Sequence, residues 1–421
     1  MVKVLKWTGI SLLVILALFL VFALVYFGIS LYQVNALEDV DFPRLEIYTD
    51  GKAKIKSKEE YVDCTVTLTG AGEFDFSSAA AGIRGRGNSS WNYPKKPYRI
   101  KFDEKISVFG ESKNKSWVLL AMFNDHSLTK DRLAFSMADA LETDVFVPSY
   151  NYVELYLNGK YNGIYLLTDQ VDENKGRTNV KSDFAPEATE VPFLVELDAY
   201  AELEGPEDEA FFRIGDALYT VKYPEADERY SDEQFAYVKN YITKLDELCR
   251  KPNVTLAELS EYMDVDSFID YYIVEEVMGQ MELNWKSVYM SKAEGEKLKM
   301  GPVWDFDWSV TGPHEDSKNR NMYKDDYSNL RSNGNWFASL LNNSAEFKLA
   351  VAERWKVARV KLLDCIDDVE SDWESIKSVA SRDWYRWHWY NIFSPKPEKR
   401  YMEVMDWCRG RIAWLDTAFE V

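Results

Sequence analysis

A long apolar stretch near the N-terminus is the first clear pattern along the chain. No charged residue occurs from 7 to 37, and residues 7–32 are almost continuously apolar. A helix needs about 20 such residues to cross a bilayer. A cleaved signal peptide is the alternative, but its apolar core usually spans only ~7–15 residues and precedes an Ala-x-Ala site, which is not evident here. The pattern therefore favours a transmembrane anchor over residues 7–32.

The charges that flank this stretch differ on its two sides. Lys3 and Lys6 precede it, whereas Glu38 opens an acidic segment after it. Because basic flanks stay on the cytoplasmic side of a membrane, we expect residues 1–6 to be cytoplasmic and the chain beyond a linker at 33–43 to be exported. The expected location is the cell membrane, crossed once, with the main domain outside the cytoplasm.

Short strand patterns dominate the first part of the exported chain. Apolar and polar residues alternate over 44–70, and two further strand-like runs flank Asn158-Gly159, a typical two-residue hairpin turn. Apolar residues recur with helical spacing over 129–141. Residues 44–172 are therefore expected to form a β-rich domain that contains one helix.

Helical periodicity dominates the rest of the chain. It occurs over 232–251, over 256–281 and from about 336 to the C-terminus. A β-rich part followed by a helix-rich part is typical of α+β proteins. We expect a second domain over 173–320, a helical extension over 321–421 packed on it, and a cleft between the two domains.

The net charge and the scarcity of His and Cys narrow the function. The chain has 70 acidic and 50 basic residues, a formal net charge of −20, which disfavours binding to nucleic acid. Three His and four scattered Cys do not match zinc-ligand spacings. Oxygen ligands are therefore expected for any metal, and the four Cys leave three disulfide pairings open.

A segment rich in glycine and arginine combines positive charge with close backbone access. Residues 83–91 read Ile-Arg-Gly-Arg-Gly-Asn-Ser-Ser-Trp. Glycine lets a ligand approach the backbone, and arginine can bind anionic oxygens in a fork. A phosphate-binding loop and a β-turn with solvent-facing arginines both fit this segment. The strand at 94–102 adds Arg99 and Lys101 on one face, and such local positive charge in an acidic protein indicates an anionic ligand such as a nucleotide.

Two carboxylates in the segment Gly-Pro-Val-Trp-Asp-Phe-Asp-Trp at 301–308 are the strongest metal candidates. In an extended chain, Asp305 and Asp307 project to one face about 7 Å apart, which suits magnesium or manganese. A capped turn is the alternative. Upstream, Glu282 and Asn284 offer a carboxylate and an amide to orient a hydroxyl and complete a metal shell, which alone is a weak signal.

Aromatic residues crowd the segment at 384–390, which reads Trp-Tyr-Arg-Trp-His-Trp-Tyr. Such a segment can stack on sugars or bases, but at this density on a helix it more often packs against other elements. We therefore expect a packing seam.

Four motifs, taken in order, resemble the CotH kinase family, which is named for a bacterial spore-coat protein. They read Arg-Gly-Arg-Gly-Asn-Ser-Ser-Trp at 84–91, Pro-Lys-Lys-Pro-Tyr-Arg-Ile-Lys at 94–101, Asn-Gly-Lys-Tyr-Asn-Gly-Ile-Tyr-Leu-Leu-Thr-Asp-Gln-Val-Asp at 158–172, and the segment at 301–308. The resemblance covers about residues 45 to 312. It implies an atypical, bilobal protein-kinase-like fold with a β-rich N-lobe and a helical C-lobe. It also implies transfer of the γ-phosphoryl group of ATP, with Mg²⁺ or Mn²⁺, to Ser or Thr of exported envelope or spore-coat proteins.

The resemblance also gives roles to individual residues. Phosphate contacts would fall to the glycine- and arginine-rich loop at 84–90, with Arg84, Arg86, Gly87, Asn88 and Ser89 as its contact residues. Lys101 would pair with the phosphates as a catalytic residue, with Lys96 as the alternative, and Asp169 would lie in the hinge near adenine. Asp305 would bind the metal and act in catalysis, with Asp307 beside it.

Glu282 departs from the family pattern, which generally has an Asp in the catalytic loop followed a few residues later by Asn or Ser. Glu282 would take the catalytic role of that Asp, with Asn284 or Ser287 as a metal ligand. A misplacement of about 1 Å can cost about 10²-fold in rate. The alternative function is therefore a weak or inactive pseudokinase that acts as a membrane-anchored scaffold or binding protein.

Overall fold

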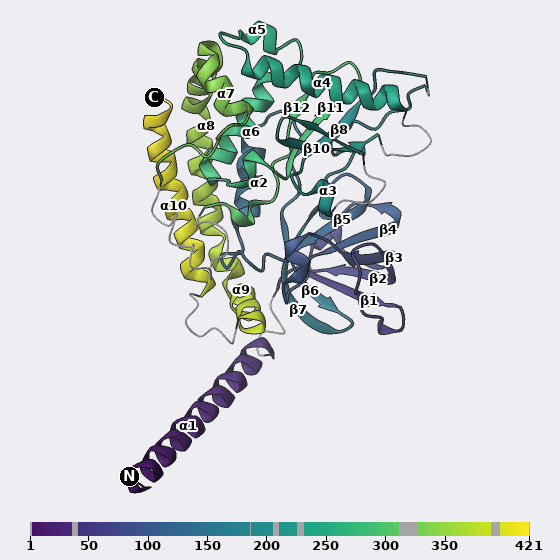
Figure 1. The fold of residues 1–421 in the computed structure, drawn as a ribbon. Helices are drawn as coiled ribbons and strands as arrows, with labels where there is room; N and C mark the ends of the chain where they lie inside the picture. Colours follow the sequence, from purple (N-terminus) through teal and green to yellow (C-terminus); the bar gives the residue numbers. More distant parts are fainter. Residues whose placement is uncertain are drawn as a thin grey trace.

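A long N-terminal helix, a closed β-barrel and a second sheet surrounded by helices follow one another along the chain (Figure 1). The computed structural model describes residues 2–35, 41–185, 187–204, 210–224, 231–310, 327–388 and 396–420. His314 and the last two residues of the aromatic segment at 384–390 lie outside the described residues. The expected α+β class is confirmed, whereas closure of the first sheet into a barrel goes beyond the prediction.

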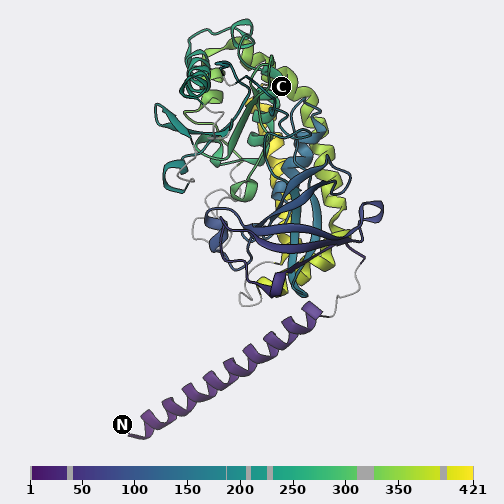
Figure 2. The same ribbon diagram turned by 90° about the vertical axis from the view of Figure 1, so that its right-hand side faces the viewer.

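Helix α1 (Val2–Asn35) extends away from the rest of the molecule in both views (Figures 1 and 2). From Val14 to Val34 it is long and apolar enough to cross a membrane, and most of its described side chains are exposed. A signal sequence meets the same criterion, because length and composition do not distinguish the two. The apolar helix is confirmed, while the side of the membrane on which the main domain lies stays a prediction.

Seven strands close the barrel in the order β1-β2-β3-β4-β5-β7-β6. Their bounds are β1 Arg44–Thr49, β2 Val62–Thr69, β3 Phe76–Gly85, β4 Tyr98–Ile106, β5 Asn114–Leu120, β6 Asn151–Leu157 and β7 Lys160–Asp169. Neighbouring strands are antiparallel except β1 and β6, which pair in parallel and close the barrel. The predicted hairpin joins β6 to β7, with Asn158 and Gly159 both at positive φ (53° and 75°), as a two-residue turn of this type requires.

A second sheet of five strands has the order β12-β11-β8-β10-β9. Its strands are β8 Phe193–Leu197, β9 Phe211–Ile214, β10 Ala217–Tyr223, β11 Val288–Lys292 and β12 Lys299–Met300. All five residues of the central strand β8 are buried, so it lacks the alternation by which half-buried strands are recognised.

Helices surround this sheet and connect it to the barrel. The α-helices are α2 Lys130–Ala140, α3 Ala201–Glu204, α4 Asp232–Arg250, α5 Leu256–Leu259, α6 Val265–Met278, α7 Trp336–Asn343, α8 Ala345–Ser371, α9 Trp373–Trp387 and α10 Pro397–Ala418. Single 3₁₀ turns lie at Asp50–Lys52, Gly72–Phe74, Ser89–Asn92, Glu282–Asn284 and Phe306–Trp308. Helix α6 is buried from Ser267 to Met278 and forms the centre of the helical part, with α2, α8 and α10 packed around it.

Two apolar cores stabilise the molecule, one inside the barrel and one shared by the second sheet and the helices. Helix α9 contacts both α10 and the barrel strand β7. Lys95 Nζ and Asp383 Oδ1, both buried, form an ion pair of 2.7 Å at this contact between α9 and the barrel. All four Cys are free thiols, so none of the open disulfide pairings forms in this structure.

Candidate active site

A cleft of about 490 Å³ lies between the barrel and the second sheet. The barrel contributes the loop after β3, the end of β5 and residues 170–173. The opposite wall comes from β8, β10 and β11, and the segment 304–308 reaches the cleft from the same side. The predicted phosphate loop and the predicted metal segment therefore face one cleft.

Arginines form the barrel wall of this cleft. The guanidinium of Arg84 lies over the ring of Tyr61, 5.2 Å from its centroid. Arg99 pairs with Arg84 across β3 and β4 and donates a hydrogen bond to Ser116 Oγ (3.2 Å). Burial lowers the pKa of Arg99. Two neighbouring guanidinium groups with partly buried charge provide an anion-binding wall.

Arg86 extends from the barrel toward the opposite wall. Its guanidinium lies 5.6 Å from the ring centroid of Trp304. Burial lowers the pKa of Arg86, whereas the nearby charges of Tyr289, Asp305 and other acidic groups oppose that shift. The charge of Arg86 on the barrel therefore interacts with the acidic groups on the opposite side of the cleft.

The backbone of the loop after β3 needs glycine. Gly87 has φ +78°, and a Cβ built there would lie 2.1 Å from Ser90 Oγ. A Cβ on Gly85 would lie 2.4 Å from the ring of Trp91. A side chain at either position would displace Ser90 or Trp91, so both glycines allow the close packing of this loop.

Three carboxylates meet on the acidic side of the cleft. One oxygen each from Glu282, Asp305 and Asp307 lies within 4.8 Å of the other two. Asp305 is held by Ser287 Oγ, which donates to its Oδ2 (3.0 Å), and by Gln280 Nε2, which donates to its carbonyl (2.7 Å). Oxygen donors at this spacing fit one hard divalent cation such as Mg²⁺ or Mn²⁺.

Asp305 has the backbone conformation of a constrained site. Its φ of 68° and ψ of 57° lie in the left-handed region, which residues other than glycine seldom adopt. The next residue, Phe306, donates its N–H to Asp131 Oδ1 (2.8 Å) at the start of α2. Such strained residues cluster at active sites and ligand clamps, and here α2 and the 3₁₀ turn hold the carboxylate in position.

Burial and mutual repulsion disfavour negative charge at this cluster. Burial, with the charge of Asp305, raises the pKa of Glu282 to about 8. The same causes raise the pKa of Asp307 well above its usual range. Burial also raises the pKa of the neighbouring Asp131 to about 7. A bound cation would relieve this repulsion, so the electrostatics support the fit of the cluster to a metal.

Lys286 is the cation closest to the cluster in the described chain. Its Nζ lies 2.7 Å from Glu282 Oε1 and 3.8 Å from Asp305 Oδ2, and 5.4 Å from the ring centroid of Trp308. Burial alone would lower the pKa of Lys286, but Asp305 and Glu282 outweigh burial and raise it. The ammonium group thus neutralises part of the carboxylate charge.

Four of the predicted site residues belong neither to the cleft lining nor to the carboxylate cluster. Lys101 is exposed on the outer face of the barrel, beyond Arg99 on β4. Lys96 donates to the carbonyl of Trp91 and lies over its ring, 5.1 Å from the centroid. Asp169 is buried and ion-paired with Arg177 (3.1 Å). The side chain of Asn284 binds the Arg331 carbonyl and the amides of Asn333 and Asn335 (2.9 Å each), which orders a neighbouring loop.

The remaining predicted residues lie at the cleft or at its carboxylate cluster. Those that line the cleft are Arg84, Arg86, Gly87, Asn88, Ser89, Ser287, Asp305 and Asp307. Glu282, with 1% of its side chain exposed, lies beneath the lining as part of the carboxylate cluster.

Several residues of the cleft carried no role in the sequence analysis. They are Asp131, Glu196, Lys222 and Lys286. Glu196 lies in the otherwise apolar strand β8, and Lys222 Nζ is 3.3 Å from its Oε2. In the sequence, the one signal for a functional role of Glu196 was its charge within an apolar run. Such a charge needs a partner, because burial of an unpaired charge is costly.

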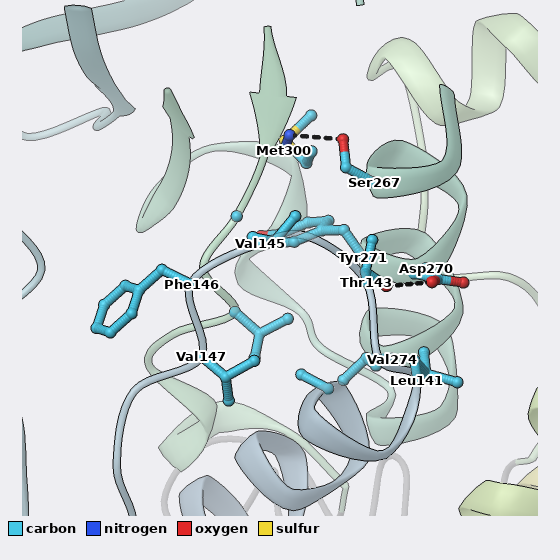
Figure 3. A pocket seen from close by; sticks show the side chains of 13 residues that line it. Leu141, Thr143, Val145, Phe146, Val147, Ser267, Asp270, Tyr271, Val274 and Met300 are labelled. Carbon is cyan, nitrogen blue, oxygen red and sulfur yellow. Dashed lines mark hydrogen bonds between the residues drawn. The ribbon is translucent and has the colours of Figure 1, made fainter. Parts of the chain in front are cut away.

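A second hollow lies behind the segment that leads to Asp305 (Figure 3). Its volume is about 30 Å³, and it is lined by apolar side chains such as Val145, Val147 and Val274 from the loop after α2 and from α6. Its polar groups are already paired, since Thr143 donates to Asp270, and the N–H of Met300 donates to Ser267 Oγ (3.1 Å). This space is far too small for a nucleotide, which leaves the large cleft as the candidate site.

Comparison with known proteins agrees with this geometry. The family model described as CotH kinase protein matches residues 83–415, more than three quarters of the chain. The match extends beyond the motif region into helices α7 to α10, so the C-terminal helices belong to the family unit. A search of curated proteins found no match. The chain belongs to the CotH kinase family.

Proposed function

We propose that this protein is an ATP-dependent protein kinase that phosphorylates Ser or Thr of exported proteins. The barrel (residues 44–172) acts as the N-lobe, residues 173–320 as the C-lobe, and residues 321–421 as a helical extension. Membership of the CotH kinase family supports a kinase-like function. One observation carries the proposal: Arg86 of the barrel approaches the acidic wall that holds Asp305, within a single cleft.

The two walls divide the work of phosphoryl transfer. Arg84, Arg86 and Arg99 supply positive charge for the phosphates, a role for which their position in the cleft favours them over Lys101 and Lys96. Residues 170–173 and the end of β5 form one edge of the cleft, with both apolar and polar groups. The nucleobase of ATP would lie against this edge. Catalysis of this reaction rests mainly on positioning and on offsetting charge.

Glu282, Asp305 and Asp307 would hold Mg²⁺ or Mn²⁺, with Ser287 fixing the orientation of Asp305. The bound cation would offset the charge of the phosphates and carboxylates. Glu282, ionised once a cation offsets the charge of the cluster, would accept the proton of the substrate hydroxyl, and that oxygen would bond to the γ-phosphorus. The bond from the γ-phosphorus to the bridging oxygen then breaks, and ADP leaves with the electron pair.

The apolar helix α1 supports a location at the cell membrane. We propose that it is retained as an anchor and that the main domain lies outside the cytoplasm, because Lys3 and Lys6 precede the helix and acidic residues follow it. The substrates would then be envelope or coat proteins, and a role in the spore coat follows from the family alone.

A catalytically weak pseudokinase is the second candidate function. The ion pair between Lys286 and Glu282 favours it, because the ammonium lies where Glu282 would otherwise face a metal or a substrate hydroxyl. Such a protein would bind nucleotide in the cleft and act as an envelope scaffold.

One experiment separates these functions. The full chain in lipid nanodiscs is incubated with γ-labelled ATP, MnCl₂ and Ser/Thr-containing exported proteins, beside an Asp305→Ala variant. Transfer of label that the variant lacks supports the kinase. Nucleotide binding without transfer identifies the pseudokinase, and a folded protein that binds no nucleotide contradicts both.

A further inference from the structure

The end of helix α1 packs against helix α9 rather than projecting freely (Figures 1 and 2). Among residues 14–34 of α1, the side chains shielded from solvent are Tyr26, Ser30, Gln33 and Val34. Their spacing of four, three and one places them on one helical face. Ser30 is only 3% exposed, in a helix whose neighbouring side chains are mostly exposed.

Arg382 of α9 ties this helix to the barrel. Its Nε donates to the carbonyl of Val34 (2.6 Å), and its Nη1 contacts Glu154 (3.1 Å) and the hydroxyl of Tyr156 (2.9 Å) on β6. The guanidinium also lies over the ring of Tyr161, 3.8 Å from the centroid. One buried arginine thus joins the end of α1, α9 and the barrel.

The level of the bilayer along α1 follows from its length. Tyr26 comes 19 positions after Trp7 in the sequence. At a rise of ~1.5 Å per residue, this segment of helix spans about 28 Å, close to the ~30 Å thickness of the hydrocarbon core. With Lys3 and Lys6 at one interface, Tyr26 lies at the opposite interface. Trp and Tyr are the residues that favour these two boundaries.

The end of α9 reaches the same level. Tyr385 lies about one helical turn beyond Arg382, on the face of α9 that contacts α1. Around Tyr385 lie Arg386, which stacks on Trp387 (4.3 Å), and the exposed Lys396, whose Nζ is 5.9 Å from the Tyr385 centroid. The indole of Trp387 donates to the carbonyl of Asn162 on β7 (2.9 Å), which joins this group to the barrel.

We propose that Tyr385, Arg386, Trp387 and Lys396 form a membrane-contact surface that rests on the lipid headgroups of the leaflet where α1 emerges. Amphipathic aromatic rings beside basic groups suit this boundary, where rings meet acyl chains and cations meet phosphates. The aromatic segment predicted as a packing seam then has a second role at its exposed edge. This surface holds the barrel next to the membrane and directs the second sheet away from it (Figure 1).

The proposal rests on the retention of α1 as an anchor, but it does not depend on phosphoryl transfer.

The test uses the full chain with Cys365→Ser, because Cys365 is the one half-buried thiol and the other three are buried. Single cysteines at positions 385, 396, 349 and 32 carry an environment-sensitive fluorophore in vesicles of phosphatidylcholine and phosphatidylglycerol. Lipids with a spin label on the headgroup serve as quenchers. Leu349 on α8 is 61% exposed and is the aqueous control, and Tyr32 on α1 is 69% exposed and is the anchor control.

We expect quenching at 385, 396 and 32 and full emission at 349. Quenching at 32 without quenching at 385 and 396 would show an inserted anchor with the domain held away from the lipid, which overturns the proposal. Emission that is unquenched at all four positions would overturn the anchor as well. Phosphoryl transfer, measured separately on the same samples, reports on the kinase proposal independently.

Discussion

Lys286 and Glu282 form a close ion pair, 2.7 Å from Nζ to Oε1, at the bottom of the cleft. The side chain of Glu282 is 1% exposed and that of Lys286 is 20% exposed. Asp305 and Asp307 stand beside this pair, and the same ammonium lies 3.8 Å from Asp305 Oδ2. The residue that we propose for the catalytic role is therefore buried and ion-paired with Lys286.

Replacing Glu282 by Gln should stabilise the protein in EDTA at pH 8. The folded-state pKa of about 8 lies above the ordinary 4.5, so the folded protein retains a proton that the unfolded chain loses. Stability from this group therefore falls as the pH rises from about 4.5 to about 8. We expect Glu282→Gln to raise the melting temperature by a few degrees at pH 8 and by little near pH 5, since each pKa unit is worth about 1.4 kcal/mol.

Thermal unfolding from pH 5 to pH 8.5 measures this effect. The exposed Glu104→Gln serves as the control variant. An equal shift at both ends of the pH range would show that Glu282 is ionised in the folded protein throughout.

Replacing Arg86 by Ala should weaken nucleotide binding by about 10- to 100-fold, the loss of one or two charge-assisted hydrogen bonds. Arg86→Lys should restore only part of it, because an ammonium group cannot replace a forked guanidinium. Titration of a fluorescent ATP analogue measures the affinity. Lys101→Ala provides the comparison, since Lys101 is exposed outside the cleft lining. Equal losses in the two alanine variants would contradict the geometry of the cleft.

Local patterns allowed much of this fold to be predicted. The turn at Asn158-Gly159 has the positive φ values its residues favour, and α4 (Asp232–Arg250) matches the helix predicted over 232–251. The carboxylates of Asp305 and Asp307 and the arginines of the loop after β3 do face one cleft. These features depend on neighbouring residues, which the sequence displays directly.

Long-range arrangements escaped prediction. Barrel closure depends on the parallel pairing of β1 with β6, about which the sequence of either strand says nothing. Arg99 and Lys101 share the outer face of β4, yet only Arg99 lines the cleft, because the second sheet covers one end of that strand. Asn284 was a metal-ligand candidate because its side chain carries an amide oxygen. In the structure, that side chain forms hydrogen bonds with the loop at 331–335 instead.

Replacing Gly87 by Ala should lower both the stability of the protein and its affinity for nucleotide. Backbone strain alone would lower only the stability. Gly51 is a matched control: it has φ +58° with no atom within 4 Å of an added Cβ, whereas at Gly87 (φ +78°) the Cβ would meet Ser90 Oγ. Both variants should lose about 1 kcal/mol of stability from the left-handed conformation. Only Gly87→Ala should also lose nucleotide affinity. Unchanged affinity in that variant would show that the loop does not contact the nucleotide.

The buried pair Lys95 and Asp383 should prove costly to break on one side only. Asp383 Oδ1 also accepts the N–H of Ile164 (2.9 Å), and Lys95 Nζ donates to the Ile164 carbonyl (2.6 Å). Lys95→Met or Asp383→Leu alone should destabilise the protein by about 3–5 kcal/mol, because each leaves a buried charge without its partner. The double variant should lose less than the sum, measured by denaturant unfolding. Additive losses would mean that the two groups do not interact.

Calorimetric titration of MnATP into the full chain and into Asp305→Ala tests the central claim most directly. The account predicts that the parent binds and that Asp305→Ala loses at least about 100-fold in affinity, more than changes outside the ligand shell usually cause. Lys101→Ala should bind like the parent. Binding by Asp305→Ala with the affinity of the parent would contradict the account, because the carboxylate side of the cleft would then hold no metal.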